Sequence, residues 1–363
     1  MTMLIQLAFT GLLVAMLPLA IVLKSKNTDK YQKLIFITLF LTFDLIMFGS
    51  FTRLTDSGLG CPDWPGCYAQ ANPLLAHADI SAAEALMPTG PVTVTKAWIE
   101  MIHRYLAMAV GVLIIAIMAV AWGRWLKSGR KLLTFSPTLP TALFLLVCLQ
   151  GAFGAWTVTM KLQPIIVTIH LLLGLAMLAM LAILALRHQA QPSIAEAARS
   201  LVAPALIALT LLVIQIVLGG WVSTNYAVMA CTDFPLCHGM LLPPMDFEHG
   251  FTIWRELGKT ANGDLLPVEA LTAIHWVHRS FAFIVIVFIA WLAFKAIKIE
   301  GLRQTGKWML IAIGAQFASG VSTIYLSWPI VIAVLHNGGA AVLVLLLVML
   351  IYKAKLAGKH NAL

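Results

Sequence analysis

The stretch WIEMIHR, residues 98–104, opens an apolar run that continues to residue 122. This run is long enough to cross a lipid bilayer as a helix, which takes about 20 apolar residues. Glu100 and His103 are three residues apart in it, so a helix places both side chains on one face. Ionisable groups inside a membrane span are costly and mark candidate functional sites, although at the edge of a span they can also lie in the headgroup layer without a role.

The whole chain has the composition of a protein that crosses the membrane many times. Of its 363 residues, 61% are hydrophobic and only 11% are charged, which excludes an ordinary soluble domain. We therefore predict an all-α membrane protein whose first partner is the lipid bilayer. No basic segment or clear cleavage site accompanies the first apolar run, so we expect a retained helix there rather than a signal peptide. The nine predicted spans cover residues 4–23, 34–52, 98–122, 139–159, 164–187, 201–222, 271–294, 307–326 and 330–352.

The distribution of positive charge predicts the topology. Seventeen of the 24 Lys and Arg residues fall in one set of loops, whereas the long loops 53–97 and 223–270 hold four basic residues and most of the acidic ones. Because basic loops stay in the cytoplasm, we expect the N-terminus and both long loops outside and the C-terminus in the cytoplasm of a bacterial inner membrane. The net charge of +9 therefore indicates topology, not nucleic-acid binding. The seventeen are Lys24, Lys26, Lys30, Lys33, Arg124, Lys127, Arg130, Lys131, Arg187, Arg199, Lys295, Lys298, Arg303, Lys307, Lys353, Lys355 and Lys359.

Several other residues are defined by their place in these spans. We expect Asp44 to be a buried carboxyl without an evident partner, and Cys148 to be a packing residue. Five tryptophans fall at the predicted outer interface, as an aromatic belt requires. They are Trp98, Trp156, Trp221, Trp276 and Trp328.

Two copies of a four-helix unit are visible in the sequence. GSFTRLTDSGLGCPDWPGC (49–67) aligns without a gap with GGWVSTNYAVMACTDFPLC (219–237), and IEMIHR (99–104) aligns with IHWVHR (274–279). A third block aligns Gln150, Gly154, Thr157 and His170 with Gln316, Gly320, Thr323 and His336. We predict an extra N-terminal helix with a cytoplasmic loop (1–33), a first four-helix bundle (34–190) and a second (191–363). Because each unit has an even number of helices, we expect both bundles to have the same orientation in the membrane and to be related by an axis along the membrane normal.

Four histidines are the strongest functional signal. Each lies roughly 10 Å inside a span that runs from outside to inside, so all four lie at one level near the outer face. One membrane histidine is more often a hydrogen-bonding residue between helices than a ligand. Two per repeat at one depth instead fit the two axial positions of a haem iron. They predict two haem sites, most simply one formed by His103 with His170 and one by His278 with His336, while pairing across the halves stays open.

The sequence supports other ligands and contacts less strongly than it supports the two haem sites. Zinc fits less well, because the Cys and His residues have no tight ligand spacing at one level. Arg104 and Arg279 each follow a histidine, and they either bind haem propionates or extend towards the interface.

Two cysteine pairs lie in the long outward loops. Cys61 and Cys67, like Cys231 and Cys237, are six residues apart with an intervening proline, a spacing that allows a small disulfide loop in an oxidising compartment. Each pair is either a staple that shapes its loop or a redox-active pair. We favour the staple for Cys231 and Cys237 and leave both roles open for Cys61 and Cys67.

The halves differ at one position that matters chemically. The first has Glu100 three residues before its histidine, where the second has His275. A carboxylate beside a haem acts as a general base or stabilises a developing cation. We therefore expect the reactive site in the first half and an electron-transfer or structural haem in the second.

In order, the motifs GLGCPDWPGC, IEMIHR, TIH (168–170), CTDFPLC, IHWVHR and VLH (334–336) resemble the haem A synthase family of cytochrome oxidase biogenesis. The resemblance covers residues 34–352, and the first helix departs from the family's eight-helix plan. It implies oxidation of the C8 methyl group of haem O to a formyl group, by successive hydroxylations through an alcohol and a hydrated aldehyde. Haem O is then the substrate, haem A the product, and the farnesyltransferase that makes haem O an expected partner. The electron acceptor stays open.

The resemblance also implies roles for individual residues. Glu100 matches the glutamate that the family needs for activity, and His103 and His170 match the ligands of the substrate haem. His278 and His336 match the ligands of a haem b. Cys61 and Cys67 match the family's first-loop cysteine pair.

Two other functions use part of the same pattern. A membrane haem transporter or chaperone needs ligands but no carboxylate, so Glu100 argues against it. A b-type electron-transfer cytochrome, or a quinone-linked thiol oxidase, predicts haems near both faces or cysteines without the histidine repeat. The four histidines at one level argue against both.

Overall fold

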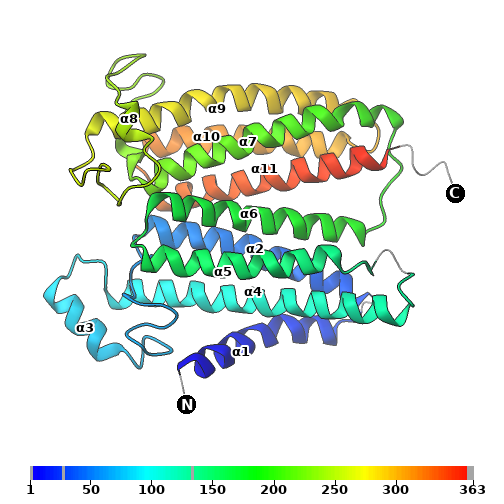
Figure 1. Cartoon of the computed structure of the whole chain (residues 1–363). Coiled ribbons are helices and arrows are strands. Elements are labelled where there is room, and N and C mark those ends of the chain that lie inside the picture. Colours follow the sequence, from blue (N-terminus) through cyan, green and yellow to red (C-terminus); the bar gives the residue numbers. More distant parts are fainter. Residues whose placement is uncertain (1–2, 27–28, 132–134, 358–363) are drawn as a thin grey trace. The chain divides into compact units, whose positions relative to one another are not determined.

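The computed structural model describes residues 3–26, 29–131 and 135–357. Within these residues nine helices are long and apolar enough to cross a membrane, which confirms the predicted all-α class and all nine spans (Figure 1). Lys359, one of the basic residues assigned to the cytoplasmic loops, lies outside the described residues. The nine are α1 (Met3–Lys24), α2 (Lys30–Leu54), α4 (Val94–Lys127), α5 (Thr138–Thr159), α6 (Pro164–Arg187), α7 (Val202–Thr224), α9 (Val268–Ile297), α10 (Arg303–Tyr325) and α11 (Ile330–Leu356).

Two of the long helices begin at a residue whose side chain accepts hydrogen bonds from the first backbone N–H groups of the helix. The Asp29 carboxylate accepts hydrogen bonds from the N–H groups of Tyr31 and Gln32 before α2, and the Thr93 hydroxyl accepts one from Lys96 before α4. These capping residues stand several positions before the apolar runs. Both helices are therefore longer than the spans that hydropathy predicts.

The loops contain short helices that the sequence did not predict. Three of them are too short or too polar to cross a membrane, whereas Glu196–Leu201 continues directly into α7 as part of the sixth span. They are α3 (His77–Leu86), α8 (Phe247–Gly250) and the 3₁₀ helices Glu196–Leu201 and Ala227–Met229.

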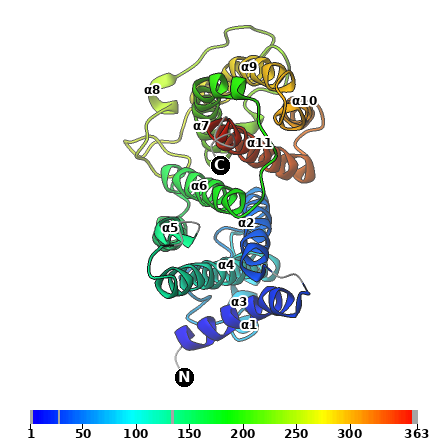
Figure 2. The same cartoon turned by 90° about the vertical axis from the view of Figure 1, so that its right-hand side faces the viewer.

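The chain forms two compact units, and α6 is divided between them. Unit 1 comprises Met1–Leu162 and Ala176–Gln189, and unit 2 comprises Gln163–Leu175 and Ala190–Leu363. In unit 1, α4 packs against α1, α2 and α5. In unit 2, α7, α9, α10 and α11 pack in a closed ring, visible from the end in Figure 2. The repeat of two four-helix bundles and its boundaries at residues 33 and 190 remain predictions.

Three residues differ from their expected environment. Asp44 and Cys148 are exposed on helices α2 and α5, so neither is the buried residue that we expected. Trp221 is only 6% exposed, and its indole N–H donates to the Gly250 carbonyl, so it is a packing residue and not part of an exposed belt. In each case the sequence indicated the span correctly, whereas hydropathy carries no information on which face of an apolar helix a residue occupies.

Candidate functional site

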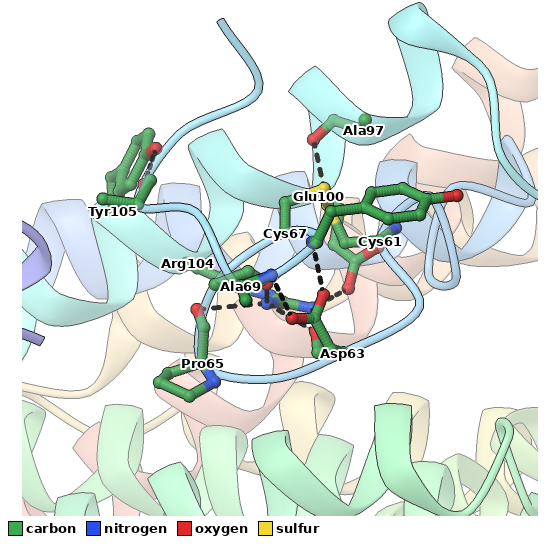
Figure 3. Close-up of a disulfide and its surroundings, with 12 residues drawn as sticks. Cys61, Asp63, Pro65, Cys67, Ala69, Ala97, Glu100, Arg104 and Tyr105 are labelled. Atoms are coloured by element: carbon green, nitrogen blue, oxygen red, sulfur yellow. Dashed lines mark hydrogen bonds and ion pairs between the residues drawn. A yellow bond between two sulfur atoms is a disulfide. The ribbon is translucent and has the colours of Figure 1, made fainter. Parts of the chain in front are cut away.

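The loop that follows α2 is closed by a disulfide. Cys61 and Cys67 form a disulfide and are fully buried, and Figure 3 shows them beside the N-terminal part of α4. The Asp63 carboxylate lies inside the loop and accepts hydrogen bonds of 2.7 Å from the backbone N–H groups of Tyr68 and Ala69. A carboxylate that accepts two backbone N–H groups fixes a turn that the short loop would not hold alone.

The loop that follows α7 has the same construction. Cys231 and Cys237 form its disulfide, and the Asp233 carboxylate accepts hydrogen bonds from the N–H groups of His238 and Gly239 at 2.8 and 2.9 Å. The two loops that align in sequence thus share their disulfide and their internal hydrogen bonds. Both cysteine pairs shape a loop, and a redox role for either stays a prediction.

The stability of the loop closed by Cys231 and Cys237 should depend on pH. The Gly239 and His238 N–H groups lower the pKa of Asp233 because they bond its charged form. The stability that this carboxylate contributes is therefore present above its unfolded pKa of about 3.9, and it is lost as the pH falls through the lower folded value. We expect a phosphine reductant to cleave this disulfide more slowly in the wild type than in Asp233→Ala at pH 5, as measured by alkylation of the freed thiols. This difference should shrink as the pH is lowered through the folded pKa of Asp233. Equal rates would contradict a holding role for Asp233.

Arg104 lies against the first disulfide loop. Its Nη1 donates to the carbonyls of Asp63, Pro65 and Gly66 at 3.1, 3.2 and 2.6 Å, and its Nη2 donates to the Asp63 carbonyl at 3.1 Å and to the Glu100 carboxylate (Figure 3). The sequence did not predict this contact between an arginine and loop carbonyls. The internal repeat singles out both arginines, since each directly follows an aligned histidine, but it does not indicate what they bind.

Arg279 makes the corresponding contact in unit 2. Its Nη2 donates to the carbonyls of Asp233 and Leu236 at 2.7 and 3.1 Å, and its guanidinium lies 5.3 Å from the centre of the Phe234 ring. Arg104 and Arg279, for which the sequence left propionate binding and extension towards the interface both open, therefore each contact a loop. Their binding to a propionate stays a prediction.

Glu100 is a buried carboxylate in α4 and is only 4% exposed. Its Oε2 accepts a 2.8 Å hydrogen bond from the Cys61 backbone N–H, and its Oε1 accepts one from Arg104. Hydrogen bonds to an ionised group are about twice as strong as those between neutral groups, and a low dielectric strengthens them further. The carboxylate is thus held in a defined position three residues before His103, where it can accept a proton or stabilise positive charge.

His103 lies on α4 in unit 1, with its ring against Gly49 of α2. A Cβ added at Gly49 would lie 3.0 Å from the His103 Cε1, so the glycine leaves room for the imidazole. The Phe48 ring stacks on it with centroids 6.1 Å apart. His170 lies on the part of α6 that belongs to unit 2. The pairing of His103 with His170 therefore stays a prediction.

His278 lies on α9 in unit 2 and is held from two sides. A Cβ added at Gly219 of α7 would lie 2.9 Å from its Cε1. The Gln215 amide nitrogen is 3.1 Å from the His278 Nδ1 and donates to the backbone carbonyl of the same residue. These contacts fix where the His278 imidazole lies in unit 2.

His336 lies on α11 of the same unit in a similar setting. A Cβ at Gly320 of α10 would lie 3.1 Å from its Cε1, and the Ser319 hydroxyl is 2.9 Å from its Nδ1. The Gln316 amide nitrogen donates to the His336 carbonyl and lies 3.3 Å from Nε2. His278 and His336 both lie in the part of the chain that forms unit 2. Unit 2 thus brings this predicted pair together.

The donor set suits a haem better than a bare metal ion. Among the described residues, no three His, Cys, Asp or Glu side chains gather where they could hold an ion. A haem needs only two axial ligands from the protein. His278 and His336, which lie in one unit, could supply them.

The chain is similar to known proteins along most of its length. Residues 32–348 match the model of the COX15-CtaA family, described as cytochrome oxidase assembly protein. The chain is 37% identical to the Heme A synthase of Shewanella oneidensis, over 87% of this chain and 94% of that protein. It is also 29% identical to the Heme A synthase of Erythrobacter litoralis, over 84% and 91%, and 27% identical to that of Rhodopseudomonas palustris strain HaA2, over 84% and 85%.

Proposed function

Because the chain belongs to the COX15-CtaA family of cytochrome oxidase assembly proteins, we propose that it oxidises the C8 methyl group of haem O to a formyl group and so produces haem A. The observation that carries the proposal is the 37% identity to a Heme A synthase along nearly the whole length of both chains. The reaction converts a methyl group and one water into a formyl group, four protons and four electrons. Two hydroxylations, each removing two electrons, and the loss of one water from the hydrated aldehyde complete it.

In this proposal the residues of the first half act on the substrate. His103 and His170 bind the iron of haem O and so fix the porphyrin in the protein. Glu100 is the buried carboxylate nearest in sequence to His103, and it accepts a proton that the oxidation releases or stabilises the positive charge that develops. Its two hydrogen bonds fix its orientation, which limits the reorganisation needed during the reaction. An unidentified acceptor takes the four electrons.

The second half is proposed to hold a haem b. His278 and His336 supply its axial ligands, and Gly219 and Gly320 leave space for the two imidazoles. The group would supply one-electron transfer. Gln215 and Ser319 keep the imidazoles oriented through Nδ1.

The protein is proposed to lie in the bacterial inner membrane with both disulfide loops on the outer side. The distribution of Lys and Arg supports this orientation, with the N-terminus outside and the C-terminus cytoplasmic. Disulfides also form more readily outside the cytoplasm. The farnesyltransferase that makes haem O is the proposed source of the substrate.

Expression in a bacterial host that makes haem O but lacks its own enzyme for haem A tests the activity. We expect haem A to appear in the membranes of cells that carry this chain, detected by absorption of the extracted haems. Cells that carry the empty vector should accumulate only haem B and haem O. If haem A stays absent although the full-length protein is present in the membrane and haem O is abundant, the proposed activity is wrong.

A further inference from the structure

The position of Glu100 depends on residues that do no chemistry themselves. One of its oxygens is bonded to the backbone of the disulfide loop, through the Cys61 N–H at 2.8 Å. The other is bonded to Arg104 one helical turn further along α4. Figure 3 shows the carboxylate between these two groups. Both partners must be in place for the carboxylate to keep its orientation.

Gly60 brings the loop into reach of this carboxylate. A Cβ added at Gly60 would lie 2.6 Å from the Ala97 backbone nitrogen, a distance that real Cβ atoms essentially never show. The loop backbone therefore lies directly on the backbone of α4, and only a glycine permits that approach. The next residue in the chain, Cys61, donates the hydrogen bond to Glu100.

Arg104 joins the loop to the carboxylate. Its guanidinium donates to three carbonyls of the loop, those of Asp63, Pro65 and Gly66, and also to Glu100. A planar guanidinium with several fixed donors can bridge these groups at once, whereas a lysine ammonium cannot match their directions. Arg104 thus sets the distance between the loop and the carboxylate.

The second unit provides an internal comparison. Arg279 contacts its disulfide loop in the same way, through the Asp233 and Leu236 carbonyls. In that unit, however, His275 replaces Glu100, and Ala230 stands at the position aligned with Gly60. The contact between arginine and loop is therefore common to both units. The glycine and the carboxylate occur together only in the first.

We propose that Gly60 and Arg104 are positioning residues, which press the first disulfide loop onto α4 so that the Cys61 N–H and the guanidinium hold the Glu100 carboxylate in its reactive orientation. The inference deepens the proposed function and rests on it for its effect on rate. The holding of Glu100 itself is a property of the structure and can be measured without activity.

The test uses the full-length protein in membranes and compares Gly60→Ala and Arg104→Lys with the wild type. Gly123→Ala is the matched control, because it makes the same change on α4, where an added Cβ contacts nothing within 4 Å. The first readout is modification of Glu100 by an apolar carbodiimide, mapped by mass spectrometry. We expect slow modification in the wild type and the control, and modification several-fold faster in both positioning variants.

The second readout separates positioning from substrate binding. A misplacement of about 1 Å can reduce a rate about 100-fold, so we expect haem A formation to fall ~10- to 100-fold in both variants while bound haem O stays near the wild-type amount. The rate of haem A formation in the double variant should be no lower than in the slower of the two single variants, since both residues act through one carboxylate. If Arg104 binds a propionate instead, bound haem O falls with the rate in Arg104→Lys.

The outcomes distinguish the inference from the proposed function. Wild-type protein that makes no haem A while carbodiimide labelling follows the expected order contradicts the function alone. Carbodiimide labelling of Glu100 that is equal in the wild type and both positioning variants contradicts the holding of the carboxylate. Faster labelling with a normal rate of haem A formation contradicts its importance for the reaction.

Discussion

Glu100→Gln is expected to reduce the rate of haem A formation by ~100- to 10,000-fold, which is the usual contribution of a general acid or base. The amide keeps the shape of the side chain, and its oxygen can still accept the hydrogen bond from the Cys61 N–H. It cannot take up a proton, and it removes the charge that pairs with Arg104. The variant should therefore retain haem O and accumulate it. The measurement is the rate at which haem O is converted to haem A in membranes with equal amounts of protein.

Asp44→Asn is the matched control for this change. It also converts a carboxylate in a membrane span to an amide, but Asp44 is exposed on α2 and has no place in the proposed site. We expect normal haem A formation from this variant. A normal rate in Glu100→Gln would show that the carboxylate does not take part in the reaction, and a similar loss in both variants would show that the effect is not specific to Glu100.

His278→Ala and His336→Ala are each expected to remove the low-spin haem b signal from the purified protein. A haem with two axial imidazoles is low-spin, and the loss of one ligand leaves the iron with a single protein ligand. The measurement is the reduced-minus-oxidised absorption spectrum, with helix content by circular dichroism as a check on folding.

His249→Ala is the corresponding control. His249 lies in the short helix α8, outside the membrane-spanning helices, and its Nδ1 is 2.6 Å from the Asp246 carboxylate. We expect its spectrum to equal that of the wild type. An unchanged haem b signal in both His278→Ala and His336→Ala would reject the proposed site in unit 2.

The nine helices could be predicted because about 20 consecutive apolar residues have few other uses in a protein. The internal repeat also made the histidine pairs and the two cysteine loops predictable, because its aligned positions show which residues are the same in both halves. The structure confirms both disulfides and places His278 and His336 in one unit.

The features that the sequence could not predict depend on the direction in which a side chain points, which composition does not determine. Asp44 and Cys148 lie on nearly uniform apolar helices, where no amphipathic pattern marks the buried face. The contacts of Arg104 depend on a loop that folds back onto α4 through a single glycine. Backbone carbonyls carry no sequence signal of their own, so an arginine that binds them cannot be distinguished in the sequence from one that binds a propionate.

The haems that copurify with the wild-type protein test the two-site arrangement most directly. Their masses identify them, because haem A differs from haem O by one oxygen gained and two hydrogens lost. We expect haem B together with haem O or haem A in the same protein, one group for each histidine pair. Haem B alone, from cells that contain abundant haem O, would contradict a substrate site at His103 and Glu100 and would favour a b-type electron-transfer protein.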